Sequence, residues 1–323
     1  FGQRAEGERR RARPDRAFVR YLAPARRARV PLWRLALGAL ALYVALTLSG
    51  SALAELLLAT YPEDAAAGPL RRRLLAEFTV VALANIALAW AIMPALLLAE
   101  GPRLKDLIGP PGAPLGRSLA VGAAATVAAI PMLIGLDLLL PGGGAVYAYA
   151  GPFPGWLGLA IAAFALVPLQ AGAEELIFRG YLLQGLAARC RHPAVWAGAP
   201  SLAFGALHYD PTLGPELAAA YVISTAIFGL WASWATWRTG SLGVAIGAHV
   251  ANNWVALLLV GLSDDALSAL ALWRASDVGA LSIIAGTALE AALFTALLET
   301  PLVRRRLGTP PLVAARQSSS ISQ

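Results

Sequence analysis

The sequence has little charge and almost no cysteine for its length. Only 14% of its 323 residues are Asp, Glu, Lys or Arg, whereas 58% are hydrophobic, and the mean hydropathy is +0.63. Cys190 is the single cysteine, which excludes an intrachain disulfide and a multi-cysteine metal cluster. The alternating ~10-residue segments of an outer-membrane barrel are also absent. Because backbone polar groups in lipid must be satisfied inside helices or closed barrels, we expect an all-α, polytopic transmembrane helix bundle.

The apolar residues fall in blocks whose lengths approach the ~20 residues that a bilayer crossing needs. We expect about eight spans, with any active site buried within the bundle. The predicted spans cover approximately residues 35–58, 74–98, 118–140, 157–189, 194–209, 217–237, 242–261 and 278–298. The fourth block is longer than a perpendicular crossing requires, so we expect it to be tilted, broken near Gly180, or extended along the inner surface.

The basic residues have an uneven distribution. A net charge of +7 with a pI near 10.1 is compatible with nucleic-acid binding, but the arginines gather at the N-terminus and beside span ends, which is typical of membrane orientation. We therefore expect no nucleic-acid partner. The domain prediction is a basic cytoplasmic segment at 1–31, a transmembrane domain at 32–303 and a cytoplasmic tail at 304–323. Only the cluster 71–73 falls on the outer side in this topology.

Source and membrane are predicted from the same composition. Alanine, arginine and leucine dominate, and Lys105 is the single lysine, a bias typical of a high-GC bacterial genome. With both termini on the cytoplasmic side, the expected location is the bacterial inner membrane.

Two adjacent glutamates and an arginine lie inside the fourth apolar block. Charge at membrane depth costs roughly 2.5–3.5 kcal/mol on insertion scales, so it is retained mainly where it pairs or acts. Glu175 and Arg179 are i,i+4 neighbours on a helix and can form an ion pair. Glu174 is turned by ~100° from Glu175 and is left over, as a general base or acid. The alternative is that both glutamates share Arg179 as a structural link between helices.

Two of the three histidines also lie within predicted spans. His208 follows Phe204 by one turn in the fifth block, and His249 precedes Asn253 by one turn in the seventh, so each pair shares a helix face. Helical rise places Glu174, His208, His249 and Asn253 roughly 10–23 Å from the cytoplasmic face, which is one common level. Gln170, one turn before Glu174, is a further candidate for the same cavity. His192 lies in a connection and is expected to have no catalytic part.

Together these residues form three motifs in a fixed order. The motifs are Glu174-Glu175-x-x-x-Arg179, Phe204-x-x-x-His208 and His249-x-x-x-Asn253. This set resembles the CPBP family of intramembrane proteases, which includes the type II CAAX prenyl endopeptidases and bacterial relatives linked to bacteriocin processing and immunity. The resemblance covers about residues 155–262.

The resemblance implies a role for each motif residue. Glu174 would activate water and His208 would assist, while His249 and Asn253 would stabilise the oxyanion of the tetrahedral intermediate. Glu175, Arg179 and Phe204 would support the site structurally. The implied activity is hydrolysis of a peptide bond near the cytoplasmic face of the bilayer, in a membrane-embedded or lipidated peptide or protein substrate.

A catalytic metal is one alternative. Glu174, His208 and His249 make up a His2Glu set, which is a known catalytic zinc arrangement. The His-Glu-x-x-His helix motif is absent, and use of Glu174 as a ligand would remove the obvious base. We therefore favour a site without metal or other cofactor.

Two further alternatives concern the class of protein. A secondary transporter could use a buried Glu/His relay, although the sequence shows neither repeat symmetry nor paired broken helices. A non-catalytic immunity or scaffold protein of the membrane could retain the same residues.

Overall fold

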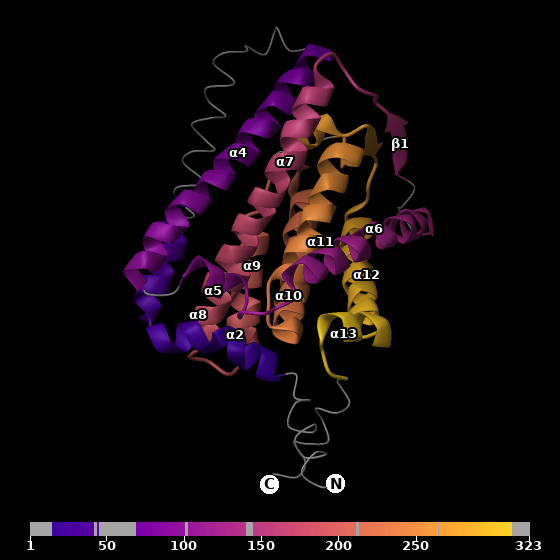
Figure 1. Ribbon diagram of the computed structural model, residues 1–323. Coiled ribbons are helices and arrows are strands. Elements are labelled where there is room, and N and C mark those ends of the chain that lie inside the picture. The colour runs from indigo at the N-terminus through magenta and orange to yellow at the C-terminus, as the bar shows by residue number, and fades with distance from the viewer. Residues whose placement is uncertain are drawn as a thin grey trace.

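The computed structural model describes residues 15–41, 44, 69–100, 103–139, 145–210, 213–263 and 265–311, and most of them are helical (Figure 1). The prediction of a helical protein is confirmed. A short helix at Leu32–Ala41 covers the described start of the first predicted span, whose remainder lies almost entirely outside the described residues. The helices that follow the N-terminal α2 (Asp15–Ala28) are α4 (Pro69–Glu100), α5 (Leu104–Ile108), α6 (Leu115–Leu139), α7 (Trp156–Glu175), α8 (Leu183–Ala187), α9 (Ala199–Ala206), α10 (Pro215–Thr239), α11 (Gly243–Trp254), α12 (Ala280–Leu298) and α13 (Pro301–Leu307).

Several helices are apolar enough for a membrane. Within the described residues, 4 helices are long and apolar enough to cross one: Leu115–Gly135, Trp156–Ala187, Pro215–Thr239 and Ala280–Leu298. Shorter apolar helices cover Leu32–Ala41, Ala194–Ala206 and Gly243–Leu259. This composition supports an integral membrane protein, whereas the total of eight crossings stays a prediction.

Three stretches of π-helix adjoin the regular helices in the described part of the chain. They are η2 (Leu176–Leu182) between α7 and α8, η3 (Ala194–Gly198) before α9, and η5 (Val255–Leu259) after α11. The fourth predicted span is therefore one helical run of 32 residues, Trp156–Ala187. Its expected extra length is confirmed, but near Gly180 the chain continues through a π-helical turn and does not break.

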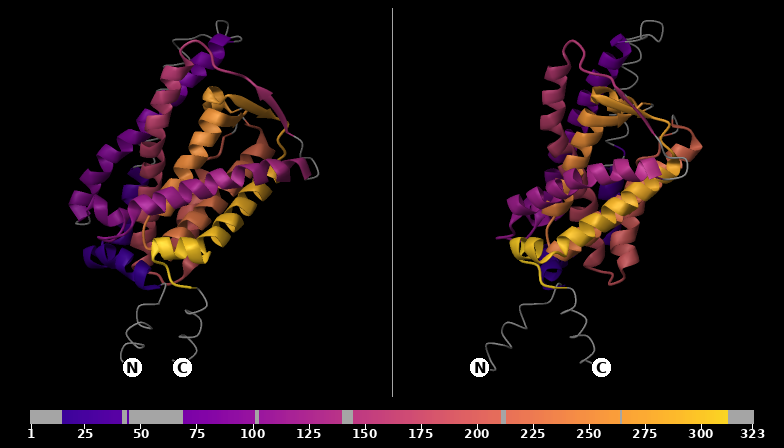
Figure 2. Two further views of the ribbon diagram at one scale, coloured as in Figure 1. Left: turned by 45° about the vertical axis from the view of Figure 1, so that its right-hand side comes forward. Right: turned by 90° about the vertical axis from the view of Figure 1, so that its right-hand side faces the viewer.

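A small sheet lies toward the end of the molecule opposite α2 and α13 (Figures 1 and 2). Its strands are β1 (Val146–Tyr149), β2 (Val260–Leu262) and β3 (Trp273–Ser276), in the order β1-β3-β2. β1 pairs antiparallel with β3 in the register Val146↔Ser276, and β2 pairs parallel with β3. The all-α prediction is wrong here, because strands of three or four residues are too short to show an alternating pattern. The 3₁₀ helix η6 (Ala266–Leu270) connects β2 to β3.

Arg72 at the start of α4 links separate segments at the sheet end of the molecule. Its guanidinium donates to four backbone carbonyls at 2.8–3.0 Å, those of Ala150, Gly151, Ala269 and Ala271. Its Cζ atom also lies 5.2 Å from the centre of the Phe153 ring. The arginine cluster 71–73, which disagrees with the predicted topology, thus includes a residue that binds backbone carbonyls of two separate segments.

Helix α2 lies at the end of the molecule opposite the sheet (Figure 1). Phe18, Tyr21 and Leu22 form its buried face. The Tyr21 hydroxyl donates toward the carbonyl oxygens of Leu107 at 2.8 Å and of Arg179 at 3.0 Å. Burial raises the pKa of the Tyr21 phenol, so the group remains a donor. The predicted basic segment 1–31 therefore contains a helix that packs against α8 and α10 and bonds to η2 through Tyr21.

Glycines let α6 and α11 cross in close contact. A Cβ atom on Gly122 would lie 2.2 Å from the Val244 carbonyl oxygen, and one on Gly247 would lie 2.1 Å from that of Leu119. Small residues at helix crossings are a general device of membrane bundles because they allow backbones to approach. The crossing fixes α11, which carries His249 and Asn253.

We expect Gly122→Ala to lower the thermal stability of the purified protein, because overpacking a tight contact costs about 1–3 kcal/mol. The matched control is Gly135→Ala in the same helix, where an added Cβ meets nothing within 4 Å. The control should keep or raise stability, since alanine favours helix over glycine. Thermal unfolding in detergent measures both, and equal melting temperatures for the two variants would contradict the proposed contact.

Candidate active site

Each predicted motif lies beside a π-helical stretch. Glu174 and Glu175 end α7 directly before η2, Phe204 lies in α9 after η3, and His249 and Asn253 lie in α11 before η5. α7 packs against α11, and α9 packs against η2. π-Helical turns inside α-helices are frequent at functional sites. The fold therefore brings the three predicted motifs to one region of the bundle.

A fully buried ion pair lies at the centre of this region. Arg179 Nη1 donates to Glu175 Oε1 at 3.1 Å, and both side chains have 0% exposure. The ion pair predicted from their spacing is present. The guanidinium also lies over the Phe204 ring, with its Cζ atom 4.5 Å from the ring centre, as expected for a cation–π contact.

His249 adds a contact that its sequence context does not reveal. Its Nδ1 atom lies 2.9 Å from Glu175 Oε1, the same oxygen that Arg179 reaches. Because a carboxylate only accepts hydrogen bonds, Nδ1 carries the proton. Its Nε2 atom then faces Glu174 Oε2 at 3.5 Å. The edge contacts with Phe204 and Phe228, at 5.9 and 5.3 Å between ring centres, hold the imidazole in this orientation.

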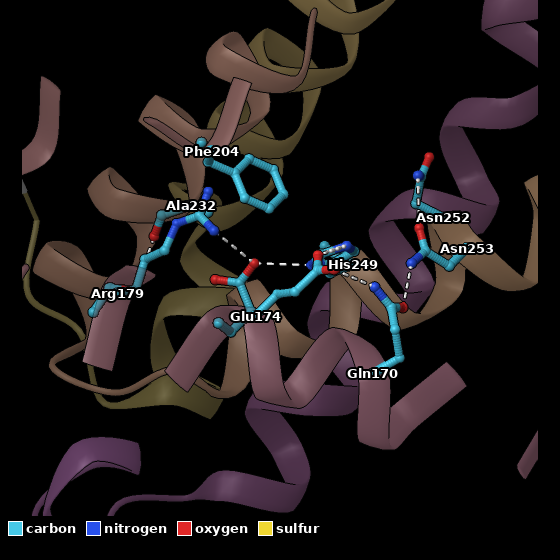
Figure 3. Close-up of polar contacts among 12 residues, drawn as sticks. Gln170, Glu174, Arg179, Phe204, Ala232, His249, Asn252 and Asn253 are labelled. Carbon is cyan, nitrogen blue, oxygen red and sulfur yellow. Dashed lines mark hydrogen bonds and ion pairs between the residues drawn. The ribbon is translucent and has the colours of Figure 1, made fainter. Parts of the chain in front are cut away.

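Glu174 is the more accessible of the two glutamates. Its side chain is 15% exposed, and its Oε1 atom accepts a hydrogen bond from Gln170 Nε2 at 2.6 Å. The Oε2 atom has no hydrogen-bond donor among the described residues. Gln170 Oε1 in turn accepts from Asn253 Nδ2 at 2.8 Å, so Gln170 lies between Glu174 and Asn253 (Figure 3).

These groups open on a cavity of about 770 Å³. Its walls are largely apolar and include Leu83, Ile177, Phe178, Leu207 and Leu257. Its polar lining comprises Thr79, Asn85, Gln170, Glu174, His208, Asn253 and Asp265. Glu174, His208 and Asn253 thus share one cavity, whereas His249 is not part of its lining and contacts the two glutamates.

His208 approaches the cavity from the end of α9. Its Nδ1 atom lies 2.8 Å from the Phe204 carbonyl oxygen, and its ring centre lies 4.6 Å from that of Phe204. Since the carbonyl accepts, Nδ1 carries a proton and Nε2 is available in the neutral ring. No hydrogen bond or ion pair joins His208 to Glu174. His192 is exposed in the connection before η3.

The alternative zinc set receives no geometric support. Within the part of the chain that the structure describes, no three His, Cys, Asp or Glu side chains are placed to hold a metal ion. Glu174, His208 and His249 all belong to that part. His249 is instead engaged with Glu175.

Two residues of the site carry no signal in the sequence. Phe228 on α10 touches both His249 and Arg179, but a phenylalanine in an apolar span is indistinguishable from ordinary core. Asp265 lines the cavity, with its carboxylate oxygens accepting from Leu267 N at 2.9 Å and Ser268 Oγ at 2.7 Å. Its proximity depends on the fold between β2 and β3.

Fold and site together define a class: an apolar helical protein whose acid, imidazole and carboxamide groups gather at an apolar cavity. Residues 154–255 match the family described as "Type II CAAX prenyl endopeptidase Rce1-like". This segment contains all three motifs. The resemblance predicted from the motifs is thereby confirmed, and it supports a peptidase of the CAAX-protease type in general terms.

One relative from the curated proteins is an "Uncharacterized protein YyaK" of Bacillus subtilis (strain 168). The two chains are 38% identical over 98 residues, which is 29% of this chain and 32% of that protein. The match therefore spans about a third of the relative's length. No solved structure matches this chain.

We expect Arg179→Met to destabilise the protein by about 3–5 kcal/mol, because removing one partner of a buried pair leaves the other charge uncompensated. Adding Glu175→Gln should restore part of the loss, since the double variant buries no unpaired carboxylate there. Thermal unfolding of the two variants and of Glu175→Gln alone forms a double-mutant cycle. A double variant less stable than Arg179→Met would contradict the assigned pairing.

Proposed function

We propose that the protein is an intramembrane endopeptidase that hydrolyses a peptide bond of a membrane-associated substrate. The main supporting observation is that Glu174 lines a largely apolar cavity together with His208 and Asn253. A general base must reach its water within hydrogen-bond distance, and Glu174 is the glutamate of the pair that lines the cavity. The site would lie inside a bundle of about eight spans.

The proposed reaction uses Glu174 and His208 to activate one water molecule. The water oxygen attacks the scissile carbonyl carbon while Glu174 accepts a water proton, and His208 Nε2 holds the water by a hydrogen bond. The proton then passes to the leaving nitrogen as the C–N bond breaks, which yields a carboxylic acid and an amine. Donors aimed at the developing oxyanion usually contribute strongly to such catalysis.

Asn253 and His249 are the proposed oxyanion donors. Asn253 reaches the cavity directly and has a second Nδ2 hydrogen beyond the one given to Gln170. His249 would donate to an oxyanion only with a proton on Nε2. Glu175 and Arg179, with Phe204 against the guanidinium, hold His249 so that its Nε2 atom faces Glu174.

The cavity walls restrict the substrate class. Leu83, Phe178 and Leu257 are among the apolar residues that surround the acid, so an apolar peptide segment fits better than a charged one. We propose a leader peptide, a bacteriocin-like precursor or a C-terminal sorting tail, held in or on the membrane. Cleavage near the cytoplasmic face of a bacterial inner membrane follows if α2 and the arginine-bearing α13, which lie at one end of the molecule (Figure 1), face the cytoplasm.

We expect Glu174→Gln and His208→Ala each to reduce cleavage of a membrane-associated peptide at least about 100-fold, because both remove water activation. Purified protein in nanodiscs with a fluorogenic apolar peptide gives the rate. The matched controls are Glu77→Gln, a partly exposed ion-pair residue of α4, and His192→Ala. Both controls should cleave at the wild-type rate.

Full activity in Glu174→Gln would overturn this assignment. Substrate flux into proteoliposomes without cleavage would instead support the transporter alternative. A chelator should leave the rate unchanged under the metal-free mechanism that we propose, and a loss restored by zinc would contradict it.

A further inference from the structure

Gln170 makes two hydrogen bonds to residues with proposed catalytic roles. Its Nε2 atom donates to Glu174 Oε1 at 2.6 Å, and its Oε1 atom accepts from Asn253 Nδ2 at 2.8 Å. The side chain is buried at 6% exposure and lies between the two partners (Figure 3). α7 supplies Gln170 and Glu174, and α11 supplies Asn253. We propose that Gln170 is a positioning residue that aligns the base and the oxyanion donor with each other.

The chemistry of the three groups fixes the direction of this chain. An ionised carboxylate only accepts hydrogen bonds, so the amide nitrogen of Gln170 must face Glu174. The amide oxygen of Gln170 then faces Asn253, which must present its own nitrogen. One Nδ2 hydrogen of Asn253 is used in this bond, and the second remains for the substrate. The charge on Glu174 thereby selects the orientation in which Asn253 can donate.

Glutamine suits this position better than its nearest substitutes. Methionine has a similar length but makes neither bond. Glutamate keeps an acceptor for Asn253 but turns a second acceptor toward Glu174, where like charges repel. Asparagine is shorter by one methylene and does not span both partners. The requirement is for one donor and one acceptor at the end of a side chain of this length.

This inference rests on the proposed function, because positioning has a kinetic consequence only if Glu174 and Asn253 act in hydrolysis. In an active enzyme, Gln170→Met should lower kcat about 10- to 100-fold, since small misplacements of reacting groups have effects of this size. The KM value should change by less than about three-fold, because the apolar walls that bind substrate are intact.

Three further variants separate positioning from a general structural role. Gln170→Glu should be no better than Gln170→Met, although it preserves size and the acceptor for Asn253. The double variant Gln170→Met/Asn253→Ala should lose less activity than the product of the single losses, because both changes disrupt one unit. Gln184→Met is the matched control, since Gln184 is equally buried but bonds to the Asp106 carbonyl away from the cavity. Its folded fraction should keep the wild-type kcat.

An NMR experiment tests the inference even if no cleavage activity is measured. The chain has only the asparagines Asn85, Asn252 and Asn253, so labelled asparagine gives a simple set of side-chain amide NMR signals. Gln170→Met should shift the Asn253 amide signal and speed its hydrogen exchange, while the Asn85 signal stays in place.

The outcomes separate the two proposals. An active wild type with an unchanged kcat in Gln170→Met overturns the positioning role and leaves the proposed function standing. An inactive wild type overturns the proposed function, and the NMR arm then decides the bridge: a shifted Asn253 amide supports it, and an unshifted one overturns it. A Gln170→Glu variant with the kcat of the wild type would also overturn the positioning role.

Discussion

The site depends on one carboxylate oxygen, Glu175 Oε1, which accepts hydrogen bonds from both Arg179 and His249. Glu175 Oε1 accepts from Arg179 at 3.1 Å and from His249 at 2.9 Å, in a fully buried setting. A buried charge is tolerated only when it is paired and hydrogen-bonded. Glu174 has contacts of its own, since its Oε1 atom accepts from Gln170 and its Oε2 atom faces His249 Nε2 at 3.5 Å. His249 lies between the two glutamates, so the difference between them is that Glu175 is fully buried and paired with Arg179, whereas Glu174 is 15% exposed.

The surrounding fold holds this arrangement from several sides. Phe204 and Phe228 pack against both Arg179 and His249, and Tyr21 of α2 supports the Arg179 carbonyl from below. The glycine crossing of α6 and α11 fixes the helix that carries His249. These contacts fix the positions of the charged side chains inside the apolar bundle. They come from two aromatic rings, the Tyr21 hydroxyl and the close packing of α6 against α11.

The sequence predicted the helical class and the three motifs, because long apolar blocks and ionisable residues inside them are strong signals. It also predicted the Glu175–Arg179 pair from spacing along one helix, and it marked Gln170 as a candidate for the cavity. It did not predict the contact of His249 with Glu175 or the place of Asp265 and Phe228, since these depend on how separate helices face each other. The sheet was missed because its strands are too short to show periodicity. The catalytic roles of Glu174, His208, His249 and Asn253 stay predictions.

The central claim is that Glu174, and not its neighbour Glu175, is the reactive carboxylate of an apolar cavity. A small apolar epoxide that enters the cavity tests this most directly, because an ionised carboxylate opens the epoxide to form an ester that mass spectrometry can locate. The account predicts the ester on Glu174, since Glu175 has 0% exposure and both oxygens of Asp265 are engaged by hydrogen bonds. An ester on Glu175 or on Asp265, with Glu174 unmodified, would contradict it.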